Sequence, residues 1–195
     1  MRGFTAMNYA HALICSSGWW ARTVERELLP WGLAGVDLGA DVLEIGPGFG
    51  ATTNVLARDA RPLTVLELDH GYCERLRRGL PASVEVVEGD ATQMPFDDAR
   101  FSGVVCFTML HHVPSTELQD RLLGEVSRVL APGGVFAGTD SIGDSRSFRL
   151  LHLRDTLVPV APGGLAARIE SAGLVEPKVD AAKRSFRFRA RKPLP

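Results

Sequence analysis

The sequence carries almost no net charge and few cysteines. Its formal net charge is −1 at pH 7 over 195 residues, so the chain has no overall field that would attract nucleic acid or an acidic membrane surface. The three cysteines, Cys15, Cys73 and Cys106, are odd in number and show no CxxC spacing. This pattern argues against a disulfide framework or a zinc site. We therefore predict no bound metal and a reducing, cytoplasmic location.

The sequence also lacks a long apolar run and internal repeats. No stretch approaches the length of a membrane-spanning helix, and the N-terminus lacks the apolar segment and cleavage site of a signal peptide. We therefore expect no membrane partner. Hydrophobic residues make up 45% of the 21.1 kDa chain, which is ordinary for a globular protein. A chain of this size can bury one substantial core, so we expect a single domain over residues 1–195.

What is present is an alternation of apolar and amphipathic segments from residue 41 onward. Helical patterns lie near 50–59, 71–79 and 115–130, with Ser115 as a predicted N-cap and the turn Pro132-Gly133-Gly134 as a predicted end. Strand–helix alternation predicts a mostly parallel sheet with right-handed crossovers, the Rossmann-like doubly wound α/β fold. Short runs rich in Val, Leu and Phe, as buried parallel strands require, lie at 41–45, 63–68, 83–88, 102–107 and 134–139.

The two ends of the chain differ from the predicted cofactor-binding core, which covers residues 41–140. Residues 1–40 look helical and amphipathic and are predicted to form an N-terminal cap. Residues 141–162 are predicted to form a substrate lid, and residues 163–195 a C-terminal helix and hairpin. With this antiparallel hairpin the sheet has seven strands. The helix and the two strands of the C-terminal segment are predicted at 163–172, 174–180 and 184–190.

The most informative stretch is Val42–Gly50. An apolar strand runs into Glu44, and Gly46, Gly48 and Gly50 follow at every second position. Glycine allows positive φ and lets a ligand approach the backbone closely. A glycine-rich loop between a strand and a helix is the nucleotide-binding turn of a doubly wound sheet. The loop also satisfies G-x-G-x-x-G/A, so its spacing alone fits the cofactor of an NAD(P)-dependent oxidoreductase as well.

Three acidic residues are expected to meet at the carboxyl edge of this sheet. Glu44 ends the first strand, Glu67 lies near the end of the second, and Asp90 follows the third. Carboxylates would repel a pyrophosphate. S-adenosyl-L-methionine has no phosphate and carries a positive ammonium and a positive sulfonium, and its ribose hydroxyls and adenine amine can donate to further acids. The charges therefore favour S-adenosyl-L-methionine over a nicotinamide cofactor.

At these residues the sequence resembles the class I S-adenosylmethionine-dependent methyltransferases, most closely the small single-domain members with a methyltransferase-11-like core. The resemblance covers about residues 40–140 and depends on five motifs in order. The motifs are Glu44-Ile45-Gly46-Pro47-Gly48-Phe49-Gly50, Glu67, Gly89-Asp90-Ala91, Phe107-Thr108-Met109-Leu110-His111-His112-Val113-Pro114 and Arg128-Val129-Leu130-Ala131-Pro132-Gly133-Gly134.

The resemblance implies a role for each matching residue. Glu44 and the glycine loop would hold the methionine part of the cofactor, Glu67 the ribose, and Asp90 with Ala91 the adenine. Phe107 would belong to the cofactor site as well. A competing residue for the ribose is Asp69, which could instead cap the helix that follows it.

The resemblance also implies an enzyme that transfers a methyl group by in-line displacement to a small-molecule acceptor, at an O, S, N or C atom. Where the acceptor must lose a proton, His111 or His112 is the candidate base, because histidine titrates near neutral pH. The alternative interpretation of the pair is a loop that closes over the cofactor. Methyltransferases of adenine amines usually carry an Asn/Asp-Pro-Pro-Tyr type of motif here, and the segment 107–110 lacks it.

An RNA methyltransferase is kept as the alternative function because the segment 183–192 is basic. The other interpretation of this segment is a strand in which Phe186 and Phe188 alternate with arginines, giving one buried face and one charged face that discourages edge-to-edge association. We favour this second interpretation, so nucleic acid is not the expected partner. The basic residues are Lys183, Arg184, Arg187, Arg189, Arg191 and Lys192.

The acceptor site is expected to be built by the segments that cover the cofactor. Trp19 and Arg22 of the cap are predicted to face the cleft, with Arg22 pairing the cofactor carboxylate, while Trp20 and Trp31 pack the cap onto the sheet. Aromatic residues suit apolar or planar acceptors. No oligomeric state is predicted. The predicted lid contributes Phe148, His152, Arg154 and Asp155.

Overall fold

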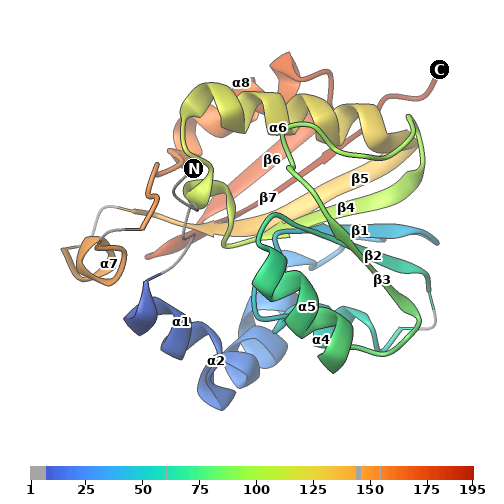
Figure 1. Ribbon diagram of the computed structural model, residues 1–195. Helices are drawn as coiled ribbons and strands as arrows, with labels where there is room; N and C mark the ends of the chain where they lie inside the picture. The colour runs from blue at the N-terminus through green and yellow to red at the C-terminus, as the bar shows by residue number, and fades with distance from the viewer. Residues whose placement is uncertain (1–7, 60, 144–145, 154) are drawn as a thin grey trace.

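The computed structural model describes residues 8–59, 61–143, 146–153 and 155–195, and its centre is one sheet of seven strands (Figure 1). The strand order is β3-β2-β1-β4-β5-β7-β6. β7 pairs antiparallel with both β5 and β6, so the other six strands run in one direction. The predicted Rossmann-like sheet with a C-terminal antiparallel hairpin is confirmed. The strands are β1 (Val42–Ile45), β2 (Leu63–Glu67), β3 (Val84–Glu88), β4 (Phe101–Phe107), β5 (Leu130–Ser141), β6 (Val175–Ala181) and β7 (Ser185–Arg191).

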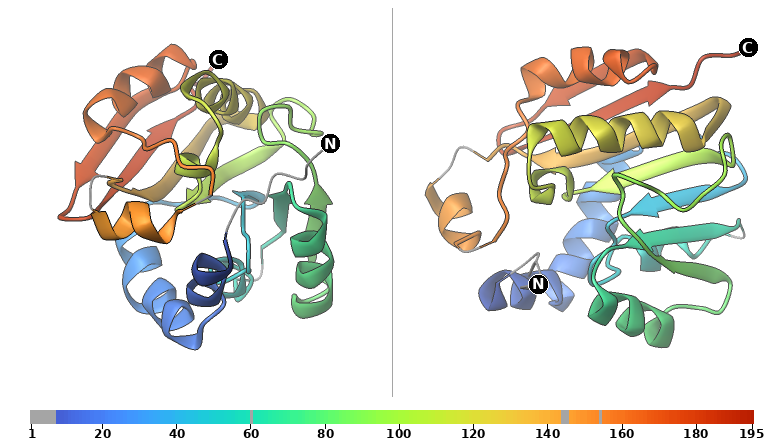
Figure 2. Two further views of the ribbon diagram at one scale, coloured as in Figure 1. Left: turned by 60° about the vertical axis from the view of Figure 1, so that its left-hand side comes forward. Right: turned by 45° about the horizontal axis from the view of Figure 1, so that its top comes forward.

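Helices cover both faces of this sheet (Figures 1 and 2). α6 and α8 pack on one face, while α4, α5 and the N-terminal helices pack on the other. None of the described helices combines the length and apolarity needed to cross a membrane. The helices are α1 (Tyr9–Cys15), α2 (Gly18–Thr23), the π-helical segment η1 (Val24–Leu28), α3 (Leu29–Gly32), α4 (Thr53–Leu56), α5 (His70–Gly79), the 3-10 turn η2 (Leu110–His112), α6 (Thr116–Val129), α7 (Arg146–Leu151) and α8 (Pro162–Ser171).

Successive residues of the central strands pack into opposite layers. Leu43 and Val104 belong to the buried cluster under α6 and α8, whereas their neighbours Val42 and Val105 belong to the cluster under α4 and α5. Side chains alternate between the faces of a strand, so a strand covered on both faces needs a continuous apolar run. This explains why the central strands were recognisable in the sequence.

Local signals explain where the helices begin. The Ser115 hydroxyl accepts a hydrogen bond from the Leu118 N–H at 3.2 Å, which makes it the predicted N-cap of α6. α4 and α6 differ from prediction at one end each for a reason that the structure shows. α4 starts later than the predicted helix at 50–59, because Gly50 has a φ of 78°, outside the helical range. α6 ends at Val129, and the segment predicted to stop it joins β5, because Gly133 and Gly134 bond to the backbone of Lys192.

The C-terminal hairpin corrects the interpretation of the basic segment. β7 lies between β5 and β6, and β6 is the edge strand. The arginines of β7 therefore cannot have the role in preventing edge-to-edge association that the sequence predicted. Phe186 and Phe188 are buried, as the alternation predicts. The guanidinium of Arg187 donates to the Trp31 carbonyl at 2.9 Å and pairs with Asp180 at 2.9 Å. This arginine therefore attaches the N-terminal helices to the sheet.

Candidate active site

A cavity of about 930 Å³ opens beyond the carboxyl ends of β1, β2 and β4. This edge of the sheet is the usual ligand site of doubly wound folds. Pockets for one drug-sized ligand measure roughly 300–1,000 Å³, so the cavity has room for a nucleoside cofactor with a small acceptor beside it. Its walls come from the glycine loop, the ends of β2 and β4, and residues of α1, α2 and α7.

The glycine loop has the conformation that its sequence predicts. Gly46, Gly48 and Gly50 have φ values of 65°, 53° and 78°, in the left-handed region that favours glycine. A Cβ on Gly46 would lie 2.3 Å from Cγ of Met109. Only glycine at position 46 therefore lets the loop pass this close to the segment after β4. Gly46 and Gly48 also line the cavity.

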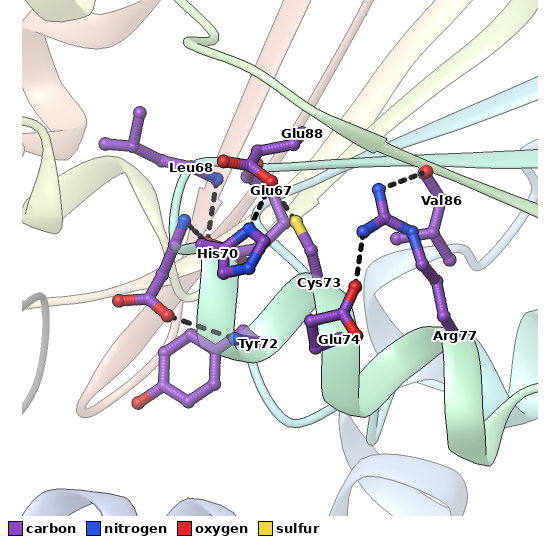
Figure 3. A network of polar contacts seen from close by, with 10 residues as sticks. Glu67, Leu68, His70, Tyr72, Cys73, Glu74, Arg77, Val86 and Glu88 are labelled. Carbon is purple, nitrogen blue, oxygen red and sulfur yellow. Dashed lines mark hydrogen bonds and ion pairs between the residues drawn. The ribbon is translucent and has the colours of Figure 1, made fainter.

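Glu67 holds this loop in place. One of its carboxylate oxygens accepts a hydrogen bond from the Gly48 N–H at 3.0 Å. The other accepts from the N–H groups of Leu68 at 2.9 Å and Asp69 at 3.0 Å, and Figure 3 shows Glu67 beside Leu68. Burial raises the pKa of Glu67, and these three backbone donors partly offset the rise. Glu67 also lines the cavity, where the ribose acid is predicted.

Glu44 lies behind the loop rather than in the cavity wall. It is 1% exposed, and one carboxylate oxygen accepts a hydrogen bond from the Thr52 hydroxyl. The other oxygen has no partner among the described residues. Burial raises the pKa of Glu44 to about 7, and the hydrogen bond from Thr52 opposes that rise. A carboxylate oxygen without a partner next to the loop fits a cofactor with a cationic group. Its direct contact with a cofactor stays a prediction.

The other predicted cofactor residues come from the ends of β3 and β4, on either side of the glycine loop. Asp90, Ala91 and Phe107 all line it. Asp90 is exposed, and its carboxylate accepts the Thr92 N–H at 2.8 Å. Asp69, the competing ribose residue, lines the cavity too, but its carboxylate caps α5 by accepting the Tyr72 N–H at 3.0 Å. This capping bond accounts for an acidic residue at position 69 even if Asp69 contacts no ligand.

His111 forms a buried pair with Asp140. The Asp140 carboxylate accepts a hydrogen bond from the His111 backbone N–H at 3.1 Å and is bonded to Nδ1 of the same residue. Because a carboxylate at Nδ1 holds the proton on that nitrogen, Nε2 keeps a free lone pair. Nε2 has no partner among the described residues, and His111 lines the cavity. Of the two predicted bases, His111 has the arrangement that a general base requires.

His112 belongs instead to a cluster with His11 and His152. The ring centroids of His11 and His152 lie 4.4 Å apart, and each lies 5.4 Å from that of His112. Burial lowers the pKa of His112 to about 2, with further lowering by His111, His11 and His152. Burial also lowers the pKa of His11 and of His152. All three imidazoles are therefore neutral near pH 7.

The segments that cover the cavity differ in part from prediction. Trp20 lines the cavity, whereas Trp19 is 61% exposed and neither it nor Arg22 contributes to the wall. The predicted Phe148 and His152 do line the cavity, and Arg154 lies outside the described residues. Sequence reasoning missed His11 and Asp140, because their partners are far away along the chain and no local pattern signals them.

Comparison with known proteins agrees with this geometry. The family model described as a methyltransferase domain matches residues 43–138. A fatty-acid O-methyltransferase of Mycolicibacterium smegmatis is 40% identical over 108 residues, which cover 53% of this chain and 38% of that protein. A phthiotriol/phenolphthiotriol dimycocerosates methyltransferase of Mycobacterium tuberculosis is 38% identical over 111 residues, covering 54% of this chain and 39% of that protein. The matches thus span well under half of the relatives' own length.

A solved structure extends the similarity to most of the fold. A SAM-dependent methyltransferase from Methanosarcina mazei superposes with a TM-score of 0.69 at 17% identity, covering 82% of this chain and 95% of that one. The sheet order of this chain, and its glycine loop with acidic neighbours, are those of S-adenosylmethionine-binding methyltransferase folds. The chain belongs to the class I S-adenosylmethionine-dependent methyltransferase family.

Proposed function

We propose that this protein transfers the methyl group of S-adenosyl-L-methionine to an oxygen atom of a small, largely apolar acceptor. The observation that carries the proposal is a single cavity lined by both the glycine loop and His111. A general base and a cofactor loop on the walls of one cavity allow the acceptor to lie between them.

The residues around the loop are suited to hold the cofactor. The backbone of the glycine loop and the buried carboxylate of Glu44 would receive the methionine part, and Glu67 the ribose hydroxyls. Asp90 and Ala91 would receive the adenine, with Phe107 on the cavity wall. When bound, this cofactor supplies a methyl carbon on a positively charged sulfur. Because it has no phosphate, the protein needs no phosphate-binding cation.

His111 supports an acceptor that must lose a proton. Methyl transfer to an acceptor oxygen would leave the electron pair of the carbon–sulfur bond on sulfur, and the acceptor oxygen would have to give up its proton. The acceptor proton passes to Nε2 of His111. Asp140 keeps the other ring nitrogen protonated and faces the imidazolium that forms, as an aspartate does beside a catalytic histidine. Asp140 is thus a positioning residue and His111 the catalytic one.

The rest of the cavity wall favours an apolar acceptor. Ile14, Trp20, Leu118, Leu122 and Leu151 all line the cavity, and apolar walls with a few polar groups select such ligands. The curated relatives are named for fatty-acid and phthiotriol substrates, which contain apolar chains. These names support an oxygen nucleophile on an apolar molecule.

Two measurements test this function separately. Calorimetric titration with S-adenosylhomocysteine tests the cofactor site, and transfer of labelled methyl groups to a panel of fatty acids, alcohols and thiols tests the acceptor. His111→Gln should lower turnover by roughly 10²–10⁴-fold without weakening S-adenosylhomocysteine binding. His70→Gln, at an exposed histidine that pairs with Glu88 and lines another part of the cavity, tests whether the loss of any imidazole from the wall has the same effect. Unchanged turnover in His111→Gln would remove the base from the mechanism.

A further inference from the structure

The histidines of this protein are concentrated at one wall of the cavity. The chain has five histidines, and four of them, His11, His111, His112 and His152, are connected by ring-centroid distances of 4.2–5.4 Å. Among these four, His11, His112 and His152 each place a ring nitrogen within 4.8 Å of one from each of the other two. They come from α1, η2 and the residue after α7, which are far apart in the sequence.

The hydrogen bonds of these three residues fix the orientation and protonation of each ring. Every Nδ1 faces an oxygen acceptor, and two of these acceptors are backbone carbonyls, which can only accept. Nδ1 therefore carries the proton in each neutral ring, and Nε2 presents a lone pair. The bonds are His11 to the Asp155 carboxylate at 2.9 Å, His112 to the Thr156 carbonyl at 3.1 Å and His152 to the Phe148 carbonyl at 2.8 Å.

One of the resulting lone pairs is buried without a partner. His152 is 4% exposed, and its Nε2 has no hydrogen-bond partner among the described residues. A buried acceptor left unpaired costs stability. The neighbouring rings cannot relieve this cost, because their own protons are engaged at Nδ1. A cation between the three Nε2 atoms would satisfy all of them.

We propose that His11, His112 and His152 bind one divalent transition-metal ion through their Nε2 atoms. Neutral imidazole suits Zn²⁺, Fe²⁺, Ni²⁺ and Cu²⁺, and metal-binding histidines commonly donate their other N–H to a carboxylate or a backbone carbonyl, as all three do here. Tetrahedral Zn²⁺ with bonds of about 2.0–2.1 Å places its ligands about 3.3 Å apart. Metal binding would therefore draw the three rings closer together.

The site would leave a coordination position open toward the acceptor. His11, His112 and His152 all line the cavity, and three protein ligands with one open position is the arrangement of catalytic zinc sites. An oxygen of the acceptor could occupy that position next to His111, whose ring centroid lies 4.2 Å from that of His112. The metal site depends on the histidine geometry alone; its use by the acceptor rests on the proposed function.

The test uses the 195-residue chain without an affinity tag, stripped of metal by a chelator and titrated with Co²⁺. The expected result is one equivalent of Co²⁺ per chain, with visible absorption bands of a low-symmetry site, displaced by Zn²⁺. His11→Gln and His152→Gln should each weaken binding at least 10-fold. Asp155→Asn, which alters the partner of His11, should weaken it by roughly 10–100-fold. His70→Gln removes a histidine that contributes no proposed ligand and should leave Co²⁺ binding unchanged.

Several outcomes would overturn the metal site. The first is a wild-type chain that binds no stoichiometric Co²⁺. The second is Co²⁺ affinity in His11→Gln and His152→Gln equal to that of the wild type. The third is loss of Co²⁺ binding in His70→Gln. If the variants do not fold, X-ray absorption of the Zn²⁺-loaded wild type decides, because a first shell without imidazole nitrogens would contradict the assignment. S-adenosylhomocysteine titration of the metal-free wild type tests the cofactor site independently, so failure of one proposal is distinguishable from failure of the other.

Discussion

The carboxylate of Glu67 at the end of β2 accepts the N–H of Gly48 in the loop after β1, at 3.0 Å. Its second oxygen is occupied by the N–H groups of Leu68 and Asp69. Both carboxylate oxygens are therefore needed as acceptors. This bond joins two neighbouring strand ends and fixes the position of the glycine loop.

Replacing this acid by its amide tests that relationship. Glutamine has one acceptor oxygen, so Glu67→Gln would turn an NH₂ group toward a backbone donor. We expect a loss of roughly 1–3 kcal/mol in the free energy of unfolding and at least a tenfold weaker affinity for S-adenosylhomocysteine, measured by denaturation and calorimetry. The matched control is Glu88→Gln, an exposed acid at the end of the adjacent strand, which should change stability by roughly 0.5 kcal/mol at most. Equal losses of stability in Glu67→Gln and Glu88→Gln would contradict a specific role for the hydrogen bond between Glu67 and Gly48.

Glu44 should make the stability of the cofactor-free protein depend on pH. Burial raises its pKa from 4.5 to about 7, so the folded state binds the proton more tightly than the unfolded state. The contribution to stability is therefore present below about pH 4.5 and lost as the pH rises to about 7. The shift corresponds to roughly 3 kcal/mol. Urea unfolding of wild type and Glu44→Gln between pH 4.5 and 8 should give a stability difference that changes across this window. A constant difference would mean that Glu44 is ionised at all these pH values.

Two glycine-to-alanine substitutions should change stability in opposite directions. A Cβ on Gly138 in β5 would lie 1.9 Å from the carbonyl oxygen of Cys106, so Gly138→Ala should cost roughly 3 kcal/mol or more. Gly124 lies inside α6 with nothing within 4 Å of the added Cβ. Gly124→Ala should therefore raise stability by roughly 0.5–1 kcal/mol. Thermal and urea unfolding measure both, and tolerance of alanine at 138 would contradict the close pairing of β4 and β5.

The alternative RNA function predicts salt-dependent binding through the basic C-terminal segment. Deleting 183–192 is not a clean test, because β7 is an interior strand of the sheet. Lys183 and Arg184 are exposed in the link before β7, so Lys183→Gln with Arg184→Gln removes charge while the sheet stays intact. We expect fluorescence anisotropy of a labelled RNA to show no specific binding by wild type or variant at physiological salt. Binding whose salt dependence decreases in the variant would support RNA as substrate.

The sequence predicted the parts of the fold that depend on local patterns. Continuous apolar runs such as that around Val104 mark strands buried on both faces, and Ser115 marks a helix start. The glycine spacing predicted the loop because positive φ values leave few alternatives to glycine. These features arise within a few neighbouring residues, which is why one sequence suffices to find them.

The rest depends on contacts between distant segments. The position of β7 between β5 and β6 follows from pairing across the chain, so its arginines were assigned to an edge that they do not occupy. Trp20 rather than Trp19 lines the cavity, because the rotation of a short helix is set by what it packs against. Asp140 could be paired with His111 only once β5 was placed beside β4.

The bond between His11 and Asp155 has a consequence for the order of assembly. The two residues are separated by 144 positions, and Asn8 likewise bonds to the Leu151 carbonyl at 2.6 Å. During synthesis the N-terminal helix leaves the ribosome long before these partners exist, and long-range contacts of this kind form late. α1 is thus synthesised well before its partners and docks late. Hydrogen exchange should find α1 opening more readily than the central strands, so the part of the cavity wall that α1 forms can open without unfolding the sheet.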